Sequence, residues 1–508
     1  MDVYIDLQGH NDFEYDARAL VGAYFPGADI SAGTCGAAVT NVISQPADDA
    51  GEVSGGALTL DIASICAGAI TKNEMRRLIY AHLHSLTGRE LPWGVLTGVR
   101  PTKLAMGHIS KSIENERTAA GVARDNPVTG NACAAGKISS AHIAAAARFM
   151  QSEYLVSADK SVLASVIAAR ELSVVSALPG TTGEDRAEAY SLYVGVPFCP
   201  SRCNYCSFAS NPIDKRADAV EPYLAALFRE LEAACEIMAG RRLHSVYIGG
   251  GTPTALEEKA FAALLDKVGG LFCPEATAEY TVEAGRPDSI TPGKLAIMKN
   301  HGVTRISVNP QTMNQRTLDA IGRRHSVEEF IEKFGLARDC GFDNINTDII
   351  LGLADETPED VAHTIEELEK LRPESLTVHA LAIKRASRMN IEADGRARSV
   401  TSAADAAEMM RISNAGAARM GLNPYYLYRQ KNMAGALENV GYAREGAEGI
   451  YNILMMEELE SIVACGAGTV TKIVRGDGTI ERCDTAKDID EYIKRIDEMI
   501  ERKRELFS

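Results

Sequence analysis

Three cysteines within eight residues are the first feature of this chain that points to chemistry. Cys199, Cys203 and Cys206 lie in the segment YVGVPFCPSRCNYCSFAS. A structural zinc site usually has four closed ligands, often in two pairs. No second cysteine pair follows here, and the next histidine downstream is His244. Three thiolates suit a 4Fe-4S cluster better, because each binds one iron and leaves the fourth iron open to another ligand. The spacing favours such a cluster, with zinc as the alternative.

The other eight of the eleven cysteines are spread singly along the sequence. The first residues, MDVYIDLQGH, are acidic where a secretory signal would be basic and then apolar. No uncharged apolar run reaches the length of about 18 residues that a membrane-spanning helix needs. We therefore expect a reducing, cytoplasmic environment without membrane insertion. In apolar stretches a free cysteine packs as a small hydrophobic residue, the role expected for Cys35, Cys66, Cys133, Cys235, Cys273, Cys340, Cys465 and Cys483.

Composition and charge narrow the class of protein. The chain of 508 residues is 46% hydrophobic and 24% charged, values typical of globular proteins, and it is long enough for more than one core. Lys and Arg number 53 against 69 Asp and Glu, which gives a net charge of −16. This excess of negative charge argues against a nucleic-acid partner. A local basic pocket remains compatible with it.

The region around the three cysteines has the pattern of alternating strands and helices. Six strand-like runs, SLYVGVPF, HSVYIG, EYTVEA, TRISVN, INTDIILG and SLTVHAL, are separated by segments with apolar residues at helical spacing. Two of these segments begin with capping signals, Ser326 with Glu329 and Thr357 with Pro358. Six successive βα units predict a parallel sheet with right-handed crossovers. Six units are two short of a closed eight-stranded barrel, so we predict an open, partial α/β barrel over residues 186–388.

The unusual polar and glycine-rich residues all follow or end predicted strands. The cysteine loop follows the first strand, the GGGTP segment at 249–253 follows the second, and Glu283 ends the third. Gln311 follows the fourth strand, and Asp348 lies in the fifth. Parallel α/β folds carry their chemistry at the carboxyl ends of the strands. The sequence therefore predicts one site at that end of the barrel.

Two regions flank the predicted barrel. Residues 1–185 have the pattern of a separate α+β domain, with a helix that ends at Gly88. After about residue 390 the strand signal fades, and we predict a mainly helical domain over residues 389–508.

Each flanking region holds a basic segment beside aromatic residues. LPWGVLTGVRPTKL contains Trp93, Arg100 and Lys103, and NPYYLYRQKN contains Arg429 and Lys431. Either segment could present cations to an anionic, planar ligand. The alternatives are a turn anchored by a buried tryptophan in the first segment and an aromatic-rich helix packed on the barrel in the second.

The motif C-x-x-x-C-x-x-C after a first barrel strand resembles the radical S-adenosylmethionine superfamily. The segments YIGGGTPTAL, SVNPQTMNQRTLDAIGRRH and INTDIILGL are similar to the oxygen-independent coproporphyrinogen III oxidase branch of that superfamily. With LTGVRPTKL and YYLYRQKN added, the resemblance is closest to HemZ-type coproporphyrinogen dehydrogenases and extends over most of the chain. It implies a partial (β/α)6 TIM-like barrel that holds a 4Fe-4S cluster and S-adenosylmethionine.

The resemblance also implies roles for individual residues. Cys199, Cys203 and Cys206 would ligate the cluster, and the methionine part of S-adenosylmethionine would chelate the fourth iron. Residues expected to contact the methionine group are Gly250, Gly251 and Thr252. Residues expected to hold the rest of S-adenosylmethionine are Glu283, Gln311, Arg323 and Asp348, with Tyr193 and Tyr205 beside the cluster and the adenine. For the four polar residues the alternative is a surface salt bridge or a helix cap.

The implied reaction is radical chemistry. An electron from the reduced cluster would cleave S-adenosylmethionine to a 5′-deoxyadenosyl radical, which abstracts hydrogen from an unactivated carbon. In the resembled enzymes the substrate is coproporphyrinogen III, two propionates of which become vinyl groups to give protoporphyrinogen IX. The expected partners are this tetrapyrrole and a reductant such as flavodoxin or ferredoxin. Arg100, Lys103, Arg429 and Lys431 are the residues expected to meet the substrate carboxylates.

One position departs from the resembled oxidases. These have a further cysteine two residues after the third ligand, where this chain has Phe208. The same departure occurs in haem-trafficking relatives that keep the cluster. Two other functions therefore stay open: a haem-binding chaperone, and a radical enzyme that acts on another tetrapyrrole.

Overall fold

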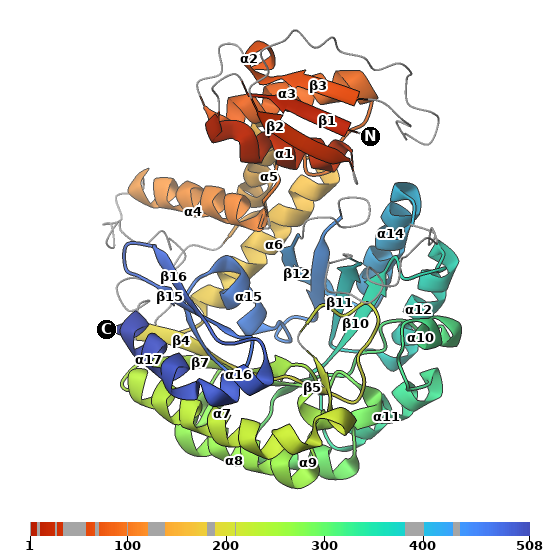
Figure 1. Cartoon of the computed structure of the whole chain (residues 1–508). Helices are drawn as coiled ribbons and strands as arrows, with labels where there is room; N and C mark the ends of the chain where they lie inside the picture. Colours follow the sequence, from red (N-terminus) through yellow and green to blue (C-terminus); the bar gives the residue numbers. More distant parts are fainter. Residues whose placement is uncertain are drawn as a thin grey trace. The chain divides into compact units, whose positions relative to one another are not determined.

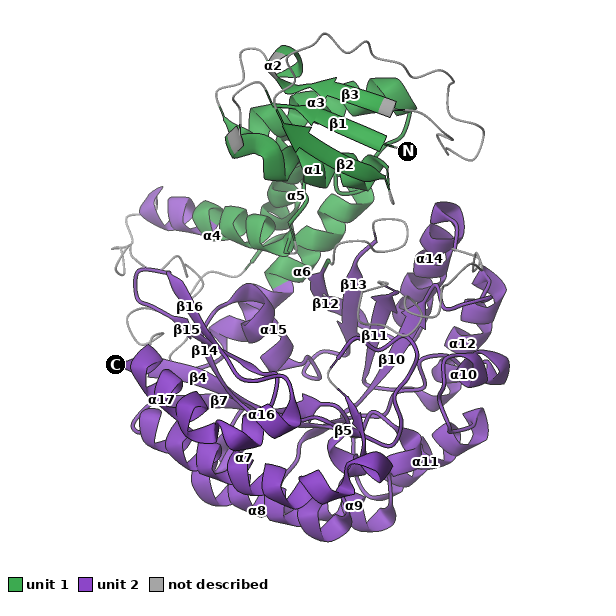
Figure 2. Ribbon diagram, in the orientation of Figure 1, with its two compact units in different colours: residues 1–112, 138–169, 429–432 green, residues 113–137, 170–428, 433–508 purple. Residues whose placement is uncertain are grey.

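The structure is a computed structural model, and it divides into two compact units (Figures 1 and 2). The smaller unit comprises Met1–Ser112, Ile138–Ala169 and Arg429–Asn432, and the larger unit contains the remainder. The described residues are 2–7, 11–25, 28–33, 57–66, 71–98, 100–119, 138–179, 188–208, 210–381, 401–429 and 437–508.

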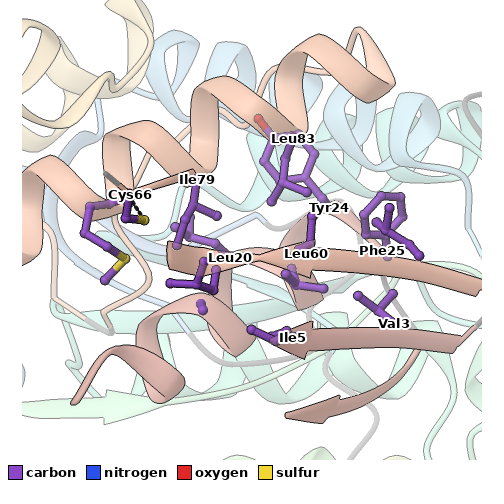
Figure 3. Packing of buried hydrophobic residues seen from close by; sticks show 14 of the residues in the cluster. Val3, Ile5, Leu20, Tyr24, Phe25, Leu60, Cys66, Ile79 and Leu83 are labelled. Carbon is purple, nitrogen blue, oxygen red and sulfur yellow. Dashed lines mark hydrogen bonds between the residues drawn. The ribbon is translucent and has the colours of Figure 1, made fainter. Parts of the chain in front are cut away.

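The smaller unit is built on a three-stranded parallel sheet in the order β2-β1-β3. Alternate residues of β1, such as Val3 and Ile5, face a core that also contains Leu20, Leu60 and Ile79 (Figure 3). This unit has the mixed α and β content that the sequence predicts. Its strands are β1 (Asp2–Asp6), β2 (Asp29–Gly33) and β3 (Ala57–Asp61), and its helices include η1 (Asn11–Phe13), α1 (Glu14–Tyr24), α2 (Ile62–Ile65) and α3 (Lys72–Thr87). Next in the chain come α4 (Thr102–Ala119), α5 (Ser140–Tyr154) and α6 (Ala158–Ser176).

Helix α3 shows how local signals set an element. Thr71 and Glu74 form a capping box at its start. The helix ends at Gly88, whose φ of +67° lies in the left-handed region that favours glycine. The predicted end of this helix is confirmed.

The larger unit contains a sheet of eleven strands in the order β12-β13-β11-β10-β9-β8-β7-β4-β14-β15-β16. Its middle part holds the six predicted barrel strands, adjacent in chain order and parallel to one another. The predicted partial α/β barrel is therefore confirmed. These strands are β4 (Ala189–Val196), β7 (Arg242–Gly250), β8 (Glu279–Glu283), β9 (Arg305–Ser307), β10 (Ile345–Leu351) and β11 (Ser375–Ala380).

Helices connect successive strands and cover one side of the barrel sheet (Figure 1). In α8, for example, Phe261, Leu264, Leu265 and Val268 are fully buried at helical spacing. The predicted capping signals at Ser326 and Thr357 are both present as hydrogen-bonded caps. The barrel helices are α7 (Ala217–Ile237), α8 (Glu258–Phe272), α9 (Pro292–Asn300), α10 (Gln315–Ala320), α11 (Val327–Asp339) and α12 (Pro358–Leu371). Short elements between them are β5 (Phe198–Cys199), β6 (Asn211–Pro212), η3 (Ile213–Lys215), η4 (Pro253–Ala255), η5 (Pro274–Ala276) and η6 (Pro287–Ser289).

The chain after residue 400 contains more helix than strand, as predicted, but it also adds five strands to the barrel sheet. Strand β13 pairs antiparallel with β11, and β14 pairs parallel with β4. These strands were not predicted, because each is short and the two that join the barrel strands, β13 and β14, pair with residues far away in the sequence. The elements are α14 (Ala403–Arg419), β12 (Asn423–Tyr428), β13 (Asn439–Ala443), α15 (Ile450–Glu457), β14 (Ser461–Cys465), β15 (Val470–Val474), β16 (Ile480–Asp484), α16 (Ile489–Lys494) and α17 (Ile496–Phe507).

The tyrosine-rich segment NPYYLY corrects one expectation. It forms strand β12, so the alternative of an aromatic-rich helix is wrong. Tyr426 lies over Gly441 of β13, where a Cβ atom would come within 1.8 Å of the tyrosine ring. The extended segment pairs antiparallel with β13, and the absence of a side chain on Gly441 leaves room for the Tyr426 ring.

Several expectations concern positions outside the described residues. The predicted domain boundaries at 185/186 and 388/389 both lie there, as do Lys431, Cys35 and Cys133. We keep the three-domain division as a proposal. Among the described helices, none has the length and apolar character needed to cross a membrane.

Candidate functional site

The cysteine loop leaves the carboxyl end of β4 and is anchored on both sides by backbone hydrogen bonds. The Thr252 N–H donates to the Phe198 carbonyl at 2.7 Å, which joins the loop to the segment that follows β7. On the other side, the Asn204 N–H donates to the Ile321 carbonyl at 2.9 Å, just beyond α10. Cys203 is buried, and Cys199 and Cys206 are half-buried. The loop therefore holds three free thiols between two neighbouring loops of the barrel.

Hydrogen-bond donors surround these thiols. Burial raises the pKa of Cys199 to about 11, although the Thr252 hydroxyl donates to its sulfur at 3.5 Å and opposes that rise. Burial also raises the pKa of Cys206, and the Phe208 N–H opposes it. A raised pKa keeps a thiol protonated until a metal replaces the proton.

Arg286 places a positive charge beside the thiols. Its Nη1 donates to the Cys203 sulfur at 3.4 Å and to the Ser201 carbonyl at 3.2 Å. The guanidinium is 4% exposed and is held in place by two hydrogen bonds to Asp288 at 2.7 and 2.9 Å. A buried cation at this position would stabilise the negative charge of metal-bound thiolates.

The glycine segment after β7 packs tightly on its neighbours. Gly250 has a φ of +101°, which other residues rarely adopt. A Cβ atom on Gly249 would lie 2.7 Å from the Glu283 carboxyl group, and one on Gly251 would lie 2.5 Å from the Phe198 carbonyl. Close approach to the chain itself thus accounts for these glycines. Contact of Gly250, Gly251 and Thr252 with a methionine group stays a prediction.

Glu283 ends β8 and lies in the interior of the barrel. It accepts a hydrogen bond from the Tyr247 hydroxyl at 2.6 Å. Burial and the nearby Asp348 carboxylate raise the pKa of Glu283 to about 7, despite this hydrogen bond. The Tyr247 ring stacks on Tyr193 and Tyr451, with centroids 6.0 and 4.6 Å away. Tyr193 therefore lies in a stack of tyrosines inside the barrel, and its contact with a cluster or adenine stays a prediction.

Asp348 of β10 accepts hydrogen bonds from two asparagines. Asn309 donates to its Oδ2 at 2.8 Å, and Asn346 donates to its Oδ1 at 2.7 Å. His379 of β11 lies 3.7 Å from Oδ2. Burial alone would raise the pKa of Asp348, but the hydrogen bonds from His379 and Asn346 lower it below its usual range. Asp348 is therefore an oriented carboxylate with a lowered pKa in the middle of its strand.

Gln311 has a strained backbone next to Asp348. Its φ of +68° is uncommon for a residue with a side chain. The Gln311 N–H donates to the Asp348 carbonyl at 3.0 Å, and the Gln311 carbonyl accepts from the Ile350 N–H at the same distance. Its side-chain Oε1 is buried and has no hydrogen-bond partner within the described part of the chain. A strained residue with an unpaired polar atom is typical of a ligand site.

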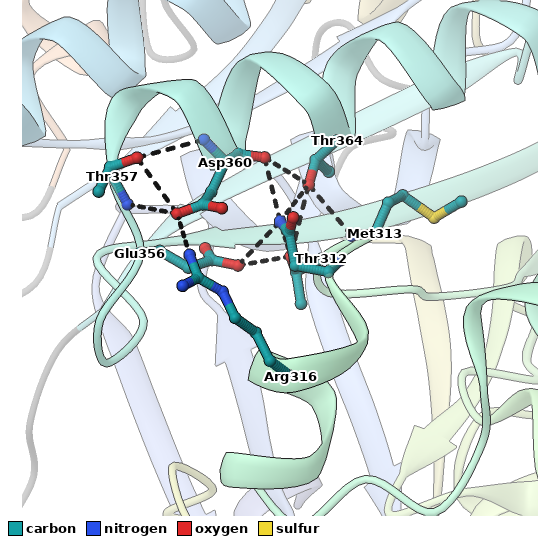
Figure 4. A network of polar contacts seen from close by, with 8 residues as sticks. Thr312, Met313, Arg316, Glu356, Thr357, Asp360 and Thr364 are labelled. Carbon is teal, nitrogen blue, oxygen red and sulfur yellow. Dashed lines mark hydrogen bonds and ion pairs between the residues drawn. The ribbon is translucent and has the colours of Figure 1, made fainter.

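A polar network fixes the loop that follows Gln311 to the start of α12 (Figure 4). Thr312 donates to Glu356 at 2.5 Å, and the Met313 N–H donates to the Thr364 hydroxyl at 3.1 Å. Arg316 donates to Asp360, the residue that caps α12 with Thr357. The loop after Gln311 is therefore held independently of any ligand.

Arg323 joins several of these residues. Its Nη1 donates to the carbonyls of Asn309 at 2.9 Å and Gly285 at 3.2 Å, and its Nη2 donates to the Tyr205 hydroxyl at 3.2 Å. The Nε atom is buried and lacks a partner among the described residues. The structure thus brings Tyr205, Arg323, Gln311 and Asp348 together through direct or shared contacts, and their contact with S-adenosylmethionine stays a prediction.

Sequence reasoning missed three residues of this region. Arg286 touches a predicted cluster ligand, and Asn309 and His379 contact Asp348. Arg286 was within reach, because it follows Glu283 at the end of a predicted strand. Asn309 and His379 had no comparable signal, since their importance depends on contacts across the sheet.

The basic residues proposed for substrate binding have structural contacts of their own. In the smaller unit, Trp93 is 1% exposed and Arg429 lies over its ring at 5.5 Å. Arg429 also donates to the Leu96 carbonyl at 2.6 Å. The alternative of a turn anchored by a buried tryptophan is therefore confirmed. Substrate contacts of Arg100, Lys103 and Arg429 stay predictions.

Most of the remaining described cysteines are at least half-buried, as expected for packing residues. Cys273 is an exception, because it is exposed and ends α8 with a φ of +46°. The described residues contain no group of three or more His, Cys, Asp or Glu side chains arranged around a single metal ion. In a 4Fe-4S cluster each thiolate ligates its own iron, so such a group is not required.

Comparisons with known proteins place this site in a family. Residues 193–368 match the model of the radical SAM superfamily. The chain is 37% identical over 437 residues to the oxygen-independent coproporphyrinogen-III oxidase-like protein HemZ of Bacillus subtilis, which covers 85% of this chain and 80% of that protein. The chain belongs to the radical SAM superfamily, in its oxygen-independent coproporphyrinogen III oxidase branch, with the HemZ-type proteins.

Two further similarities are more limited in extent. The heme chaperone HemW of Bacillus subtilis is 34% identical over 195 residues, which cover 38% of this chain and 51% of that protein. The solved structure of coproporphyrinogen III oxidase (HemN) from Escherichia coli matches with a TM-score of 0.51 and 23% identity, over 62% of this chain and 70% of that chain. This structural match shows the shared fold.

Family membership gives a 4Fe-4S cluster and S-adenosylmethionine as the cofactors of this protein. The arrangement of the described residues fits both. Three free thiols lie in one loop beside the buried Arg286. The unpaired polar atoms of Gln311 and Arg323 lie at the same end of the barrel.

Proposed function

We propose that this protein is an oxygen-independent coproporphyrinogen III dehydrogenase. In the overall reaction, each of two propionate side chains loses one hydrogen atom, carbon dioxide and one electron, which an electron acceptor takes up, and thereby becomes a vinyl group of protoporphyrinogen IX. The similarity to the HemZ protein over 85% of the chain supports this assignment. The site also supports it, because a cysteine loop and buried polar atoms without partners in the described chain lie at one end of the barrel.

The structural observation that supports the cofactor-dependent part of the proposal is the pair of unpaired polar atoms on Gln311 and Arg323. Buried polar atoms in folded proteins are nearly always hydrogen-bonded, so these two are explained if a polar ligand completes them. S-adenosylmethionine offers a carboxylate for the guanidinium and hydroxyl or amino donors for the amide oxygen. When bound, the cluster and S-adenosylmethionine supply a hydrogen-abstracting 5′-deoxyadenosyl radical.

The protein's own residues would bind and orient the two cofactors. Cys199, Cys203 and Cys206 are the proposed cluster ligands, with Arg286 stabilising their charge. Glu283, Gln311, Arg323 and Asp348 are the proposed S-adenosylmethionine contacts, with Tyr193, Tyr205, Gly250, Gly251 and Thr252 around them. The tyrosine stack beside Glu283 would exclude water from the barrel interior. The proposal includes a small reductant such as flavodoxin or ferredoxin, and a cytoplasmic location.

Phe208 favours a second function, that of a haem-binding chaperone. Its side chain is 67% exposed beside the cluster loop, at the position where the resembled oxidases have a cysteine. The heme chaperone HemW is similar to about two fifths of this chain. A chaperone would use the same scaffold without oxidising coproporphyrinogen.

One anaerobic experiment separates the two functions. The protein is reconstituted with iron and sulfide, reduced, and supplied with S-adenosylmethionine, with and without coproporphyrinogen III. A dehydrogenase forms vinyl product, and its 5′-deoxyadenosine rises when substrate is added. Tight haem binding without any vinyl product would reject the dehydrogenase in favour of the chaperone. The C203A variant, carried through the same assay, controls for reactions that do not need the cluster.

A further inference from the structure

Asn309 lies at the centre of the polar contacts at the carboxyl end of the barrel. It follows β9 by two residues and is 8% exposed. Its side chain and its backbone carbonyl each contact a different residue proposed to bind S-adenosylmethionine.

The side chain of Asn309 binds Asp348 at two points. The Asn309 Nδ2 donates to the Asp348 carboxylate at 2.8 Å, and the Asn309 Oδ1 accepts from the Asp348 N–H at 3.1 Å. A donor and an acceptor on one planar group therefore fix both the side chain and the backbone of Asp348. Aspartate has the same shape but no donor, and alanine has neither group.

The backbone of Asn309 holds a second residue. Its carbonyl accepts from Arg323 Nη1 at 2.9 Å. Two residues further on, Gln311 is bonded to β10 through its own N–H and carbonyl. The short segment from Asn309 to Gln311 therefore sets the relative positions of a carboxylate, a guanidinium and an unpaired amide oxygen.

We propose that Asn309 is a positioning residue for S-adenosylmethionine: its side chain orients the Asp348 carboxylate, while its backbone carbonyl, which any residue would supply, helps to hold the Arg323 guanidinium. The proposal rests on the roles that the proposed function gives to Asp348 and Arg323. Asn309 acts through Asp348, because its amide oxygen and an amide N–H are engaged by that residue.

Equilibrium binding of S-adenosylhomocysteine to the full-length, cluster-loaded protein tests this role. In N309D the Nδ2 donor becomes an oxygen that faces the Asp348 carboxylate, so the two carboxylates repel. We expect the Kd for S-adenosylhomocysteine to rise about tenfold or more. The cluster absorbance should stay unchanged, since Asn309 does not contact a thiol in the structure.

N309A is the second variant, in case the added charge prevents folding. It removes the two hydrogen bonds between the Asn309 side chain and Asp348 without introducing repulsion. We therefore expect a smaller rise in Kd, of about threefold to tenfold. In assays of S-adenosylmethionine cleavage, both variants should raise KM more than they lower kcat, because Asn309 positions binding groups.

Asn439 provides a matched control. It is 2% exposed, and its side chain also bonds at both ends, accepting from the Ala380 N–H at 2.9 Å and donating to the Tyr428 carbonyl at 3.4 Å. N439D therefore makes the same chemical change in a similarly buried amide whose two hydrogen bonds named here go to Ala380 and Tyr428. Its Kd for S-adenosylhomocysteine should stay within about twofold of the wild type.

The outcomes distinguish failure of this proposal from failure of the proposed function. Wild-type affinity in both N309D and N309A, or an equal loss in N439D, would overturn the positioning role. D348N is the reference: if it leaves the affinity unchanged, the assignment of Asp348 to the ligand fails first. A lack of vinyl product affects neither result, because binding is measured without a tetrapyrrole.

Discussion

Two groups of buried polar side chains in the larger unit differ in how completely they are bonded. Between α7 and α17, the fully buried carboxylate of Glu230 accepts from Lys503, from the Tyr492 hydroxyl and from the Gly466 N–H. At the carboxyl end of the barrel, Gln311 and Arg323 each keep a buried polar atom without a partner in the described chain.

The difference distinguishes buried polar groups that stabilise the fold from buried polar groups that are available to a ligand. A network whose members satisfy one another fixes the packing of two elements, and it needs nothing further. A network with unpaired buried atoms is costly unless a ligand completes it. The first kind should respond to mutation with lost stability, and the second kind with lost binding.

The largest expected effect concerns the cluster. Replacement of Cys199, Cys203 or Cys206 by alanine should abolish the iron-sulfur absorbance, because each thiolate ligates one iron. The C340A variant is the control and should keep its absorbance, since Cys340 follows α11 far along the chain. Visible absorbance after reconstitution measures both. A cluster that survives in any of the three variants would contradict the ligand assignment.

Removing one member of the fully bonded network around Glu230 should lower the free energy of unfolding without changing the affinity for S-adenosylhomocysteine. K503M leaves the Glu230 carboxylate buried without its counter-ion, and the loss of one partner of such a pair costs about 3–5 kcal/mol. Urea unfolding measures this change. The affinity for S-adenosylhomocysteine should stay at the wild-type value. A stability loss below about 1 kcal/mol would mean that Lys503 and Glu230 do not form a buried ion pair.

Glu283 predicts a pH dependence of stability. Burial raises its pKa to about 7 in the folded protein, from an ordinary value of about 4.5. The folded state therefore binds this proton more tightly than the unfolded state. The contribution is complete below about pH 4.5 and is lost as the pH rises through 7. From pH 5 to pH 8 the wild type should lose about 2 kcal/mol relative to E283Q. Urea unfolding of both proteins at each pH measures this difference. If the free energy of unfolding changes with pH in the same way in the wild type and in E283Q, the raised pKa is contradicted.

The smallest effect is expected for an exposed ion pair on the same two helices as Glu230 and Lys503. Arg229 and Asp497 are 53% and 80% exposed. Exposed pairs contribute little, so R229A should change the free energy of unfolding by less than about 0.5 kcal/mol. A loss as large as that of K503M would show that burial does not distinguish the two pairs.

The fold of the barrel could be predicted from the sequence because its signals are local. Strand-like runs alternate with amphipathic helices, and caps at Ser326 and Thr357 mark the starts of α11 and α12. The parallel arrangement then places the cysteine loop, Glu283 and Gln311 at one end.

The remaining features depend on contacts between distant residues. Strands β12 to β16 are short, and two of them join the barrel strands. The pairing of β13 with β11 and of β14 with β4 is not encoded within any one segment. The clamp between Asn309 and Asp348 crosses between neighbouring strands in the same way. A burial pattern predicts which face of a strand points inward, but it does not predict which side chains meet.

Hydrogen transfer from the substrate tests the central claim most directly. Coproporphyrinogen III is prepared with deuterium on the propionate carbons attached to the rings, and the 5′-deoxyadenosine formed anaerobically is analysed by mass spectrometry. The account predicts that this product gains deuterium in step with vinyl formation. Unlabelled 5′-deoxyadenosine, with no vinyl product, would contradict it.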